Sequence, residues 1–417
     1  MRYLKTPATS VASPATSVAA EVAAMAEQLR RQGWNAVEAL SRSLDHFEGP
    51  FRVPAEALSR AAEALPSALR SALLTAAENV RAFCRHQRAL LHDGEWELSP
   101  GLRTGLRFLP VRRAAVYIPG GRYPLPSTAV MGVVPAQEAG VERIVALSPP
   151  RKGVGVDPVV LGTLGLLGVE EVWALGGVQG VGALALGLGP VERADLLVGP
   201  GNAWVTEAKR QFFGELGIDG LAGPSEICIV ADTSADPATL AADLLAQAEH
   251  DPLAKGVLLS LDEALGEKTL EEVQKLLAQL PTEAVARSSW ERFGVVAVVS
   301  LEEAVNFAND LAPEHLELAL TSHRSVLPLF RSYGAAFLGH ASAEAFGDYV
   351  AGTNHILPTG GRARFSGGVW VGTFLRPLTH LEMSTEAADQ LAPAGEILAA
   401  AEGLAAHGAA LAARRRP

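Results

Sequence analysis

The chain has 417 residues, of which 48% are hydrophobic and 19% charged, and its formal net charge is -11. This length and hydrophobicity predict two or three packed domains and exclude a largely disordered chain. The negative charge argues against nucleic acid or an anionic membrane as a partner. No apolar run reaches the roughly 18 residues that a membrane span needs.

The two cysteines, Cys84 and Cys228, lie far apart and form no CxxC pair. They exclude a disulfide framework and a cysteine-rich zinc site. They also favour a reducing compartment, which we expect to be the cytoplasm. A bound metal would therefore use histidine, carboxylate and amide ligands.

The N-terminal segment contains the sequence PATSVA twice, from Pro7 and from Pro14. Its only basic residues are Arg2 and Lys5, which are fewer than a transit peptide requires. We therefore interpret residues 1–20 as an arm that leads into a helix.

Residues 18–90 have apolar side chains at intervals of three and four, which predicts helices, with Pro54 in a first turn. From residue 114, short apolar runs alternate with helical stretches and Gly/Pro-rich turns. This alternation predicts two α/β halves with parallel sheets. The predicted strands are Ala114–Ile118, Arg143–Leu147, Glu171–Leu175, Ala194–Val198, Glu226–Ala231, Gly256–Leu261, Val295–Val299 and Ala335–Leu338. From Thr379 onward the pattern is helical, and it ends at three arginines, 414–416.

Five of the ten histidines lie among neighbours that are typical of exposed or structurally satisfied side chains. These histidines are His46, His86, His92, His323 and His380. His340 follows a predicted strand, and we assign it no role.

A first candidate site lies at the end of a predicted helix whose N-cap is Asp236 and whose first residue is Pro237. Gln247 and His250 are three residues apart, so on a helix they would project from one face toward one cation. Taken alone, such a pair is more often structural. A second candidate is Pro313-Glu314-His315, in which a carboxylate and an imidazole combine a water-activating group with a proton acceptor.

Two further candidates lie near the C-terminus. Residues 347–349 (Gly-Asp-Tyr) and 352–355 (Gly-Thr-Asn-His) fit a tight turn and a functional loop equally well. Glu402 and His407 are five apart in the last predicted helix and do not share a face closely. Zinc prefers nitrogen and oxygen ligands of these kinds, but spacing alone does not show that they converge. The set that would suit zinc is Gln247, His250, Asp348 and His407.

Glycine-rich turns are candidates for a nucleotide site. Residues 180–185 fit the loose pattern G-x-G-x-x-A after a predicted strand, although chance explains so short a match in a glycine-rich region. Two other turns would let a cofactor approach the backbone closely: 117–121 (Tyr-Ile-Pro-Gly-Gly) and 199–202 (Gly-Pro-Gly-Asn).

Several of these segments, in this order, resemble motifs of the histidinol dehydrogenases, and the resemblance covers roughly residues 20–410. The segments are Tyr117-Ile-Pro-Gly-Gly, Gly199-Pro-Gly-Asn202, Ile218-Asp219 through Gly223-Pro224-Ser225-Glu226 and on to Gln247-Ala-Glu-His250, Ala312-Pro-Glu314-His315-Leu, and Gly347-Asp348-Tyr349 with Gly352-Thr-Asn-His355.

The resemblance implies an enzyme that oxidises L-histidinol twice, by way of L-histidinal, to L-histidine, using two NAD and one zinc per subunit. His315 would be the general base, and Glu314 would activate water for the second step. The implied zinc ligands are Gln247, His250, Asp348 and His407. The implied substrate contacts are Ser225, Gln247, His250, His315, Asp348, His355, Glu402 and His407. The implied NAD contacts are Tyr117, Gln179 and Asn202.

The fold implied by the resemblance is α/β, with two incomplete Rossmann-like domains of parallel-rich sheets and a small helical C-terminal region. Family members are homodimers whose C-terminal segment reaches into the partner's site, so Glu402 and His407 would complete the neighbouring subunit. The expected division is 1–20 for the arm, 21–117 with 225–370 for the first α/β domain, which carries most zinc and catalytic residues, 118–224 for the NAD-binding domain, and 371–417 for the C-terminal segment.

Three other functions stay open. An NAD-linked relative of the same fold would oxidise another polar alcohol, although the matches at Ser225, His355 and Glu402 favour histidinol. A zinc hydrolase would use Glu314 or His315 to activate water and would need no NAD. A non-catalytic binding protein would not need the intact Glu314-His315 pair.

Overall fold

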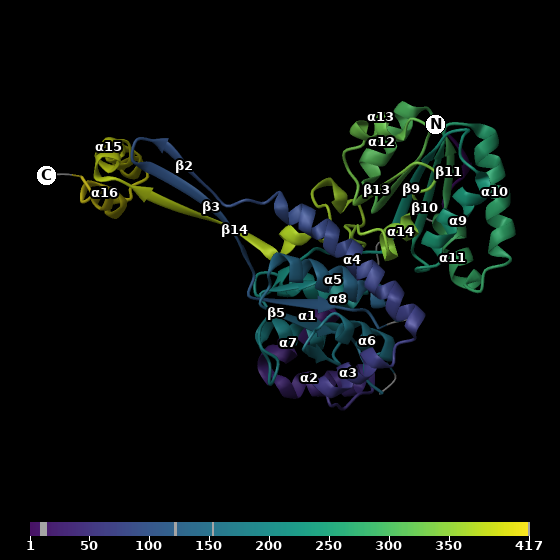
Figure 1. Ribbon diagram of the computed structural model, residues 1–417, viewed down its shortest axis with the longest axis horizontal. Coiled ribbons are helices and arrows are strands. Elements are labelled where there is room, and N and C mark those ends of the chain that lie inside the picture. Colours follow the sequence, from purple (N-terminus) through teal and green to yellow (C-terminus); the bar gives the residue numbers. More distant parts are fainter. Residues whose placement is uncertain (9–14, 121–122, 152–153, 416–417) are drawn as a thin grey trace.

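The computed structural model describes residues 1–8, 15–120, 123–151 and 154–415. Much of the first PATSVA repeat, Gly121 of the predicted glycine turn and Arg416 lie outside these ranges. The described chain forms two α/β units and a long arm that projects away from both (Figure 1). Among the described residues, every helix is too short or too polar to cross a membrane.

The five-stranded unit is built on a fully parallel sheet of order β6-β5-β4-β7-β8. Its strands are apolar runs that are buried on both faces, as expected for a parallel sheet covered by helices. The strands are β4 (Arg113–Tyr117), β5 (Arg143–Leu147), β6 (Glu171–Trp173), β7 (Leu196–Val198) and β8 (Gly217–Ile218). The helices of the chain between these strands are α5 (Pro126–Ala139), α6 (Pro158–Leu166), α7 (Gly177–Leu186) and α8 (Ala203–Phe212).

The N-terminal helices pack into the core of this same unit, because residues from Val22 to Cys84 share one hydrophobic cluster with β4 and its neighbours. Residues 22–84 therefore pack with 118–224, whereas the sequence assigned 21–117 to the unit that contains 225–370. Residues 94–110 belong to neither unit and form strands of a separate three-stranded sheet. These helices are α1 (Ala15–Gln32), α2 (Trp34–Leu40), the π-helical turn Ser41–Asp45, α3 (Ala55–Glu63) and α4 (Ser67–Ala89). Pro54 is the N-cap of α3 rather than a residue of its first turn.

The six-stranded unit has the order β1-β11-β10-β9-β12-β13, in which only the edge strand β1 is antiparallel. Thus part of the predicted N-terminal arm forms a strand of this sheet. The strands are β1 (Arg2–Lys5), β9 (Glu226–Ala231), β10 (Lys255–Ser260), β11 (Val295–Val298), β12 (His315–Ala319) and β13 (Ala335–Leu338). The accompanying helices are α9 (Pro237–Ala248), α10 (Glu263–Leu277), α11 (Glu283–Phe293), α12 (Leu301–Leu311), α13 (His323–Val326) and α14 (Glu344–Tyr349), with 3-10 turns at Leu327–Leu329, Arg362–Arg364 and Val371–Phe374.

The parallel strands of the two sheets follow the same order, with the first strand in the middle and the fourth beside it. This is the strand order of a Rossmann-like unit without its sixth strand, so the expected pair of incomplete Rossmann-like domains is confirmed. The order reverses between β4 and β7 in one unit and between β9 and β12 in the other. In such sheets a crevice for ligands forms at the carboxyl ends of these central strands.

The projecting arm is a different segment from the N-terminal residues 1–20, and it is called the arm from here on. It consists of an antiparallel sheet of order β14-β3-β2 with two helices at its far end (Figure 1). Its elements are β2 (Gly94–Ser99), β3 (Leu102–Pro110), β14 (Leu375–Met383), α15 (Thr385–Ala401) and α16 (Ala405–Ala412). The helix predicted from Thr379 therefore begins at Thr385, because residues 379–383 pair with β3 as a strand. The C-terminal region is consequently part sheet and part helix.

Candidate active site

The polar side chains singled out in the sequence gather at the amino ends of β9 and β12. These strands are parallel neighbours, and His315 pairs in register with Ile227, so the residues that precede each strand meet at one edge. Ser225 directly precedes β9, and Glu314 directly precedes β12. The site therefore lies at the edge opposite the carboxyl-end crevice of its own sheet.

Gln247 and His250 reach this edge from the end of α9. Asp236 caps this helix by accepting a hydrogen bond from the Thr239 amide at 2.9 Å, and Pro237 is the first helical residue, as predicted. The helix ends at Ala248, however, so His250 lies in the turn that follows rather than on the helix face shared with Gln247. The expected helical geometry is therefore wrong, although both side chains still point toward the same site.

A cluster suited to a cation forms where α9 meets α14. One ligand atom each of His250, Glu344 and Asp348 lies within 4.8 Å of the others, and Nε2 of His250 is 3.7 Å from Oδ2 of Asp348. Asp348 is a helical residue rather than part of a loop. Glu344 did not emerge from the sequence, although it precedes Asp348 by four residues and so shares its helix face.

His315 lies beside this cluster and follows Glu314 directly in the sequence. Its Nδ1 lies 3.1 Å from Oε1 of Gln247 and 3.5 Å from Oε2 of Glu344, and its Nε2 lies 3.7 Å from Oδ1 of Asp348. The Nε2 atom is buried and has no hydrogen-bond partner among the described residues. Burial, and then the nearby His250, lower the pKa of His315 to about 3. The imidazole is therefore neutral near pH 7 and has a nitrogen free to accept a proton.

Glu314 is buried beside His315, and its Oε2 accepts a hydrogen bond from the Glu226 amide at 3.0 Å. Burial raises the pKa of Glu314 well above its usual range, and the hydrogen bond from Glu226 opposes this only in part. Burial likewise raises the pKa of Asp348 to about 6 and that of Glu344 well above its usual range. All three carboxyl groups are buried and have raised pKa values, so a bound cation would stabilise their ionised forms.

Both ring nitrogens of His355 already have partners. Nδ1 lies 2.9 Å from the carbonyl oxygen of Asp348, and Nε2 lies 3.3 Å from the hydroxyl of Thr128. Burial lowers the pKa of His355, so its ring is neutral near pH 7. Thr128 is buried in the first turn of α5 and did not emerge from the sequence.

The residues matched to NAD contacts lie at the carboxyl edge of the five-stranded sheet. Tyr117 ends β4, and its hydroxyl accepts a hydrogen bond from the Gly177 amide at 3.2 Å. Asn202 follows β7 and caps α8. Gln179 is buried and donates to Oδ2 of Asp45 at 2.7 Å. Tyr117 and Asn202 thus flank the point at which the strand order reverses.

Glycine has a clear purpose at this edge in the turn at residues 199–202. Gly199 has a φ of +119°, and a Cβ atom there would lie 2.2 Å from the Tyr117 carbonyl oxygen, so the loop needs glycine to pass β4. The G-x-G-x-x-A match at residues 180–185 lies inside α7 and is not a phosphate-binding turn. Its Gly182 instead gives room to Leu29 and Phe212 of the core.

Glu402 caps the end of α15 and His407 lies in α16, so the single helix predicted for them is interrupted at residues 402–404, and both side chains are exposed. Figure 1 places these helices at the opposite end of the molecule from α9 and α14. Within one chain, the fold thus brings together the predicted residues Gln247, His250, Glu314, His315, Asp348 and His355, but not Glu402 or His407.

Comparison with known proteins agrees with this architecture. A model of the family described as histidinol dehydrogenase matches residues 9–415. The histidinol dehydrogenase of Thermus thermophilus is 45% identical over 397 residues, which are 94% of this chain and 94% of that protein. That of Zymomonas mobilis is 44% identical over 390 residues, 93% of this chain and 90% of that protein.

Among solved structures, the histidinol dehydrogenase of Elizabethkingia anophelis matches with a TM-score of 0.91 and 33% sequence identity. The match covers 98% of this chain and 94% of that one. Both the sequence and the three-dimensional comparison thus extend over nearly the whole molecule. The chain therefore belongs to the histidinol dehydrogenase family.

Proposed function

We propose that the protein oxidises L-histidinol by way of L-histidinal to L-histidine, with zinc at the site and NAD as hydride acceptor. In the cell this would be the last step of histidine biosynthesis, in the cytoplasm. The observation that carries the proposal is that the buried pair Glu314 and His315 lies against a cation-suited cluster, in a chain of the histidinol dehydrogenase family.

The donor set fits zinc, which binds imidazole and carboxylate readily. We assign Gln247, His250 and Asp348 as the ligands from one chain. Gln247 would bind through Oε1, which already faces the site beside Nδ1 of His315 at 3.1 Å, while its buried Nε2 has no partner among the described residues. When bound, zinc would supply orientation and charge, by holding the imidazole and amine of the substrate.

We assign NAD to the crevice between the ends of β4 and β7, with contacts from Tyr117, Gln179 and Asn202. The close passage of Gly199 over the Tyr117 carbonyl keeps side chains out of this crevice, which supports the assignment. The carboxyl end of these strands is also where Rossmann-like units bind dinucleotides.

His315 would take the hydroxyl proton of histidinol at Nε2 while the carbinol carbon loses its first hydride to NAD. The hydrogen bond that Nδ1 donates to Oε1 of Gln247 would keep the imidazole in one orientation. General-base assistance of this kind contributes about 10²–10⁴-fold to rate. The resulting aldehyde would stay in the closed site, protected from side reactions.

Glu314 would act in the second half-reaction. A cation beside Asp348 would favour the ionised form of Glu314, and a buried carboxylate is a stronger base than an exposed one. Glu314 would remove a proton from water as the water oxygen adds to the aldehyde carbon, and protonated His315 would return its proton to the carbonyl oxygen, which gives a neutral gem-diol and a neutral His315. His315 would then deprotonate the gem-diol while the same carbon gives its second hydride to a second NAD, and the carboxylate of histidine results.

Ser225 and His355 are assigned to the substrate pocket, beside Glu314 and Asp348 respectively. Glu402 and His407 of the partner subunit are assigned to the same pocket, with His407 of the partner subunit as the fourth zinc ligand. The support for a homodimer is that the arm carries these residues away from the body of its own chain.

The test is a reaction of zinc-loaded protein with a limiting amount of L-histidinol and excess NAD, in which NADH is measured to completion. The expected result is two NADH per histidinol, histidine as the product, and loss of activity on chelation. One NADH per histidinol would reduce the protein to an ordinary alcohol dehydrogenase and remove Glu314 from its role. No NADH from a metal-bound protein would favour a family member that oxidises another polar alcohol.

A further inference from the structure

A short segment after α14 joins the two α/β units by side-chain hydrogen bonds. Asn79 of α4 donates to the carbonyl oxygen of Val350 at 2.7 Å. Asn354 donates to the carbonyl oxygen of Met131 in α5, also at 2.7 Å. Residues 350–355 are therefore attached to helices of the five-stranded unit, although α14 contributes its acidic side chains to the six-stranded unit.

The backbone of this segment also requires close contact with α4. Gly352 has a φ of +97°, and a Cβ atom there would lie 2.7 Å from the carbonyl oxygen of Asn79. An L side chain would thus meet both backbone strain and a clash. The segment begins two residues after Asp348, and this contact holds it against the five-stranded unit.

His355 extends this attachment back to Asp348. A carbonyl oxygen can only accept a hydrogen bond, so the 2.9 Å contact between Nδ1 and the Asp348 carbonyl requires the proton to be on Nδ1. Nε2 of the neutral ring must then be an acceptor, and the Thr128 hydroxyl donates to it at 3.3 Å. The hydrogen bonds thus run in one direction, from Thr128 through His355 to Asp348, and they define one tautomer.

We propose that Thr128 and His355 are positioning residues that hold Asp348 in place to bind the cation of the active site. This inference rests on the proposed function, since it takes Asp348 as a zinc ligand. His355, which is also assigned to the wall of the substrate pocket, has both ring nitrogens engaged, so its hydrogen bonds act on Asp348. Groups that orient a metal ligand from behind typically contribute about 10–100-fold to metal affinity.

The hydrogen bonds from Thr128 through His355 to Asp348 form a link between the two units, and the position of Thr128 shows which part of the five-stranded unit this link reaches. Thr128 lies in the first turn of α5, the helix that follows β4 and Tyr117. In Rossmann-like units the N-terminus of this helix faces the phosphates of the dinucleotide. The link therefore joins the proposed cofactor crevice to the proposed metal site through two side chains.

The test compares zinc affinity in the full-length Thr128→Val and Thr128→Ser variants, by competition with a chelating dye and without substrate or NAD. Valine keeps the shape of threonine but removes the donor, whereas serine retains it. We expect Thr128→Val to bind zinc about 10-fold more weakly, at the low end of the range for such supporting groups, and Thr128→Ser to bind almost as the parent does.

Thr163→Val is the matched control. Thr163 is also fully buried in a helix of the five-stranded unit, but its hydroxyl donates to Val159 of its own helix at 2.8 Å. Its loss should lower stability without changing zinc affinity. Equal zinc affinity in Thr128→Val and the parent, or equal weakening in Thr163→Val, would overturn the link alone. A parent that binds no zinc would instead overturn the proposed function on which the link rests.

Discussion

Glu314 and His315 are adjacent in sequence yet serve different steps in the proposed reaction, because the start of β12 separates their surroundings. Glu314 precedes the strand and is bound by the amide of Glu226, whereas His315 begins the strand and contacts Gln247. In the proposed reaction, Glu314 would act on water through its carboxylate, and His315 would accept protons through its unpartnered imidazole nitrogen.

This division predicts the effect of Glu314→Gln. Glutamine can still accept the hydrogen bond from Glu226, so the fold should be intact, but it cannot remove a proton from water. We expect oxidation of added L-histidinal to fall by about 10²–10⁴-fold, while the first turnover from L-histidinol falls much less. Rapid-mixing measurements of NADH in the two half-reactions would show this, and an equal loss in both would remove Glu314 from the water-activating role.

The buried acids also predict how stability depends on pH. Burial, and then the nearby Asp243, raise the pKa of Glu317 from 4.5 to about 9, and a hydrogen bond joins the two carboxyl groups. The folded chain therefore keeps a proton that the unfolded chain releases above about pH 4.5. Stability contributed by protonated Glu317 is thus complete at acid pH and is lost progressively as the pH rises toward 9.

Glu317→Gln cannot ionise and should escape this loss. We expect its free energy of unfolding, relative to the parent, to improve steadily between pH 5 and pH 9, because each pH unit over which only the folded parent keeps this proton costs the parent up to about 1.4 kcal/mol. Urea unfolding of the metal-free proteins at several pH values would measure the difference. A difference that is constant across this range would mean that folding does not change the pKa of Glu317.

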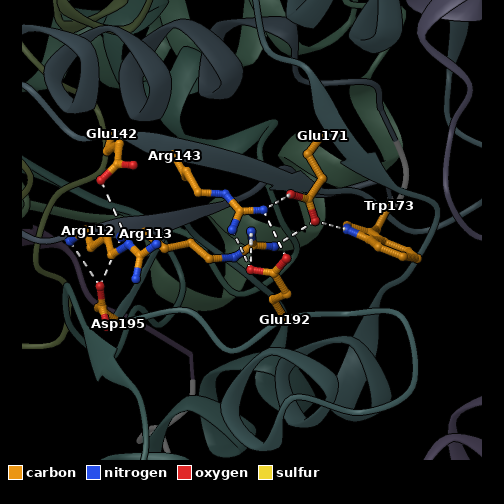
Figure 2. A network of polar contacts seen from close by, with 8 residues as sticks. All are labelled: Arg112, Arg113, Glu142, Arg143, Glu171, Trp173, Glu192 and Asp195. Atoms are coloured by element: carbon orange, nitrogen blue, oxygen red, sulfur yellow. Dashed lines mark hydrogen bonds and ion pairs between the residues drawn. The ribbon is translucent and has the colours of Figure 1, made fainter.

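At the scale of elements, one ion network closes the amino edge of the five-stranded sheet (Figure 2). Arg113 opens β4 and is buried, and its guanidinium donates to Oε1 of Glu171 at 2.6 Å. The same carboxylate accepts from the Trp173 indole at 2.7 Å, and Asp195 accepts from the Arg113 amide at 2.9 Å. The network ties the start of β4 to β6 and to Asp195, which directly precedes β7. It lies at the edge of the sheet opposite the cofactor crevice.

Arg113→Met should therefore destabilise the fold without affecting the chemistry directly. Loss of one partner from a buried ion pair typically costs about 3–5 kcal/mol, and we expect about 3 because Arg143 stays within 3.7 Å of Glu171. Arg112→Met is the control, since the Arg112 side chain is exposed and should contribute little. Denaturant unfolding measures both, and similar losses in the two variants would contradict a special role for the buried guanidinium.

The predicted strands were those with continuous apolar runs, and all eight exist with ends that differ by at most two residues. The strand β12 did not emerge because His315 and Glu317 interrupt its apolar pattern, although the sheet buries both. The arm strands β2, β3 and β14 were missed for a different reason. They lack a consistently buried face, so apolar and polar residues do not alternate along β3 or β14, and in β2 the alternation is confined to a short run, 95–99.

The site was predictable only in part for a related reason. Motif order along the chain identified Gln247, His250 and Asp348, but their convergence depends on the parallel alignment of β9 and β12, which spacing does not encode. Glu344 could have been recognised from the sequence, because it precedes Asp348 by four residues and would lie on the same face of a helix. Thr128 could not have been recognised, because its role arises only where α5 meets the segment after α14.

At the scale of the whole molecule, the arm separates two groups of residues that the proposed reaction needs in one place. Glu402 at the end of α15 and His407 in α16 lie in the arm, and the cation-suited cluster lies in the body (Figure 1). Several large apolar side chains are exposed at the tip of the arm, including Ile397 at 70% and Leu398 at 64%. Such a surface suits contact with another subunit.

This separation predicts complementation between two inactive variants. His250→Ala and His407→Ala should each lack activity as homodimers, since each removes a zinc ligand from every site. In a mixed dimer, the site of the chain with intact His250 receives an intact His407 from the other chain, whereas the second site lacks both. If unfolded chains are mixed equally and refolded, half of the dimers are mixed and half of their sites are complete, so about a quarter of the parent activity should return.

The control is refolding each variant separately, which should restore nothing. Activity should rise with the proportion of mixed dimers, and a zinc content near one quarter of the sites would accompany it. If mixing restores no activity while the parent recovers fully under the same conditions, each chain must complete its own site. The arm would then have to fold back onto its own body, and the assignment of His407 to a neighbouring subunit would be wrong.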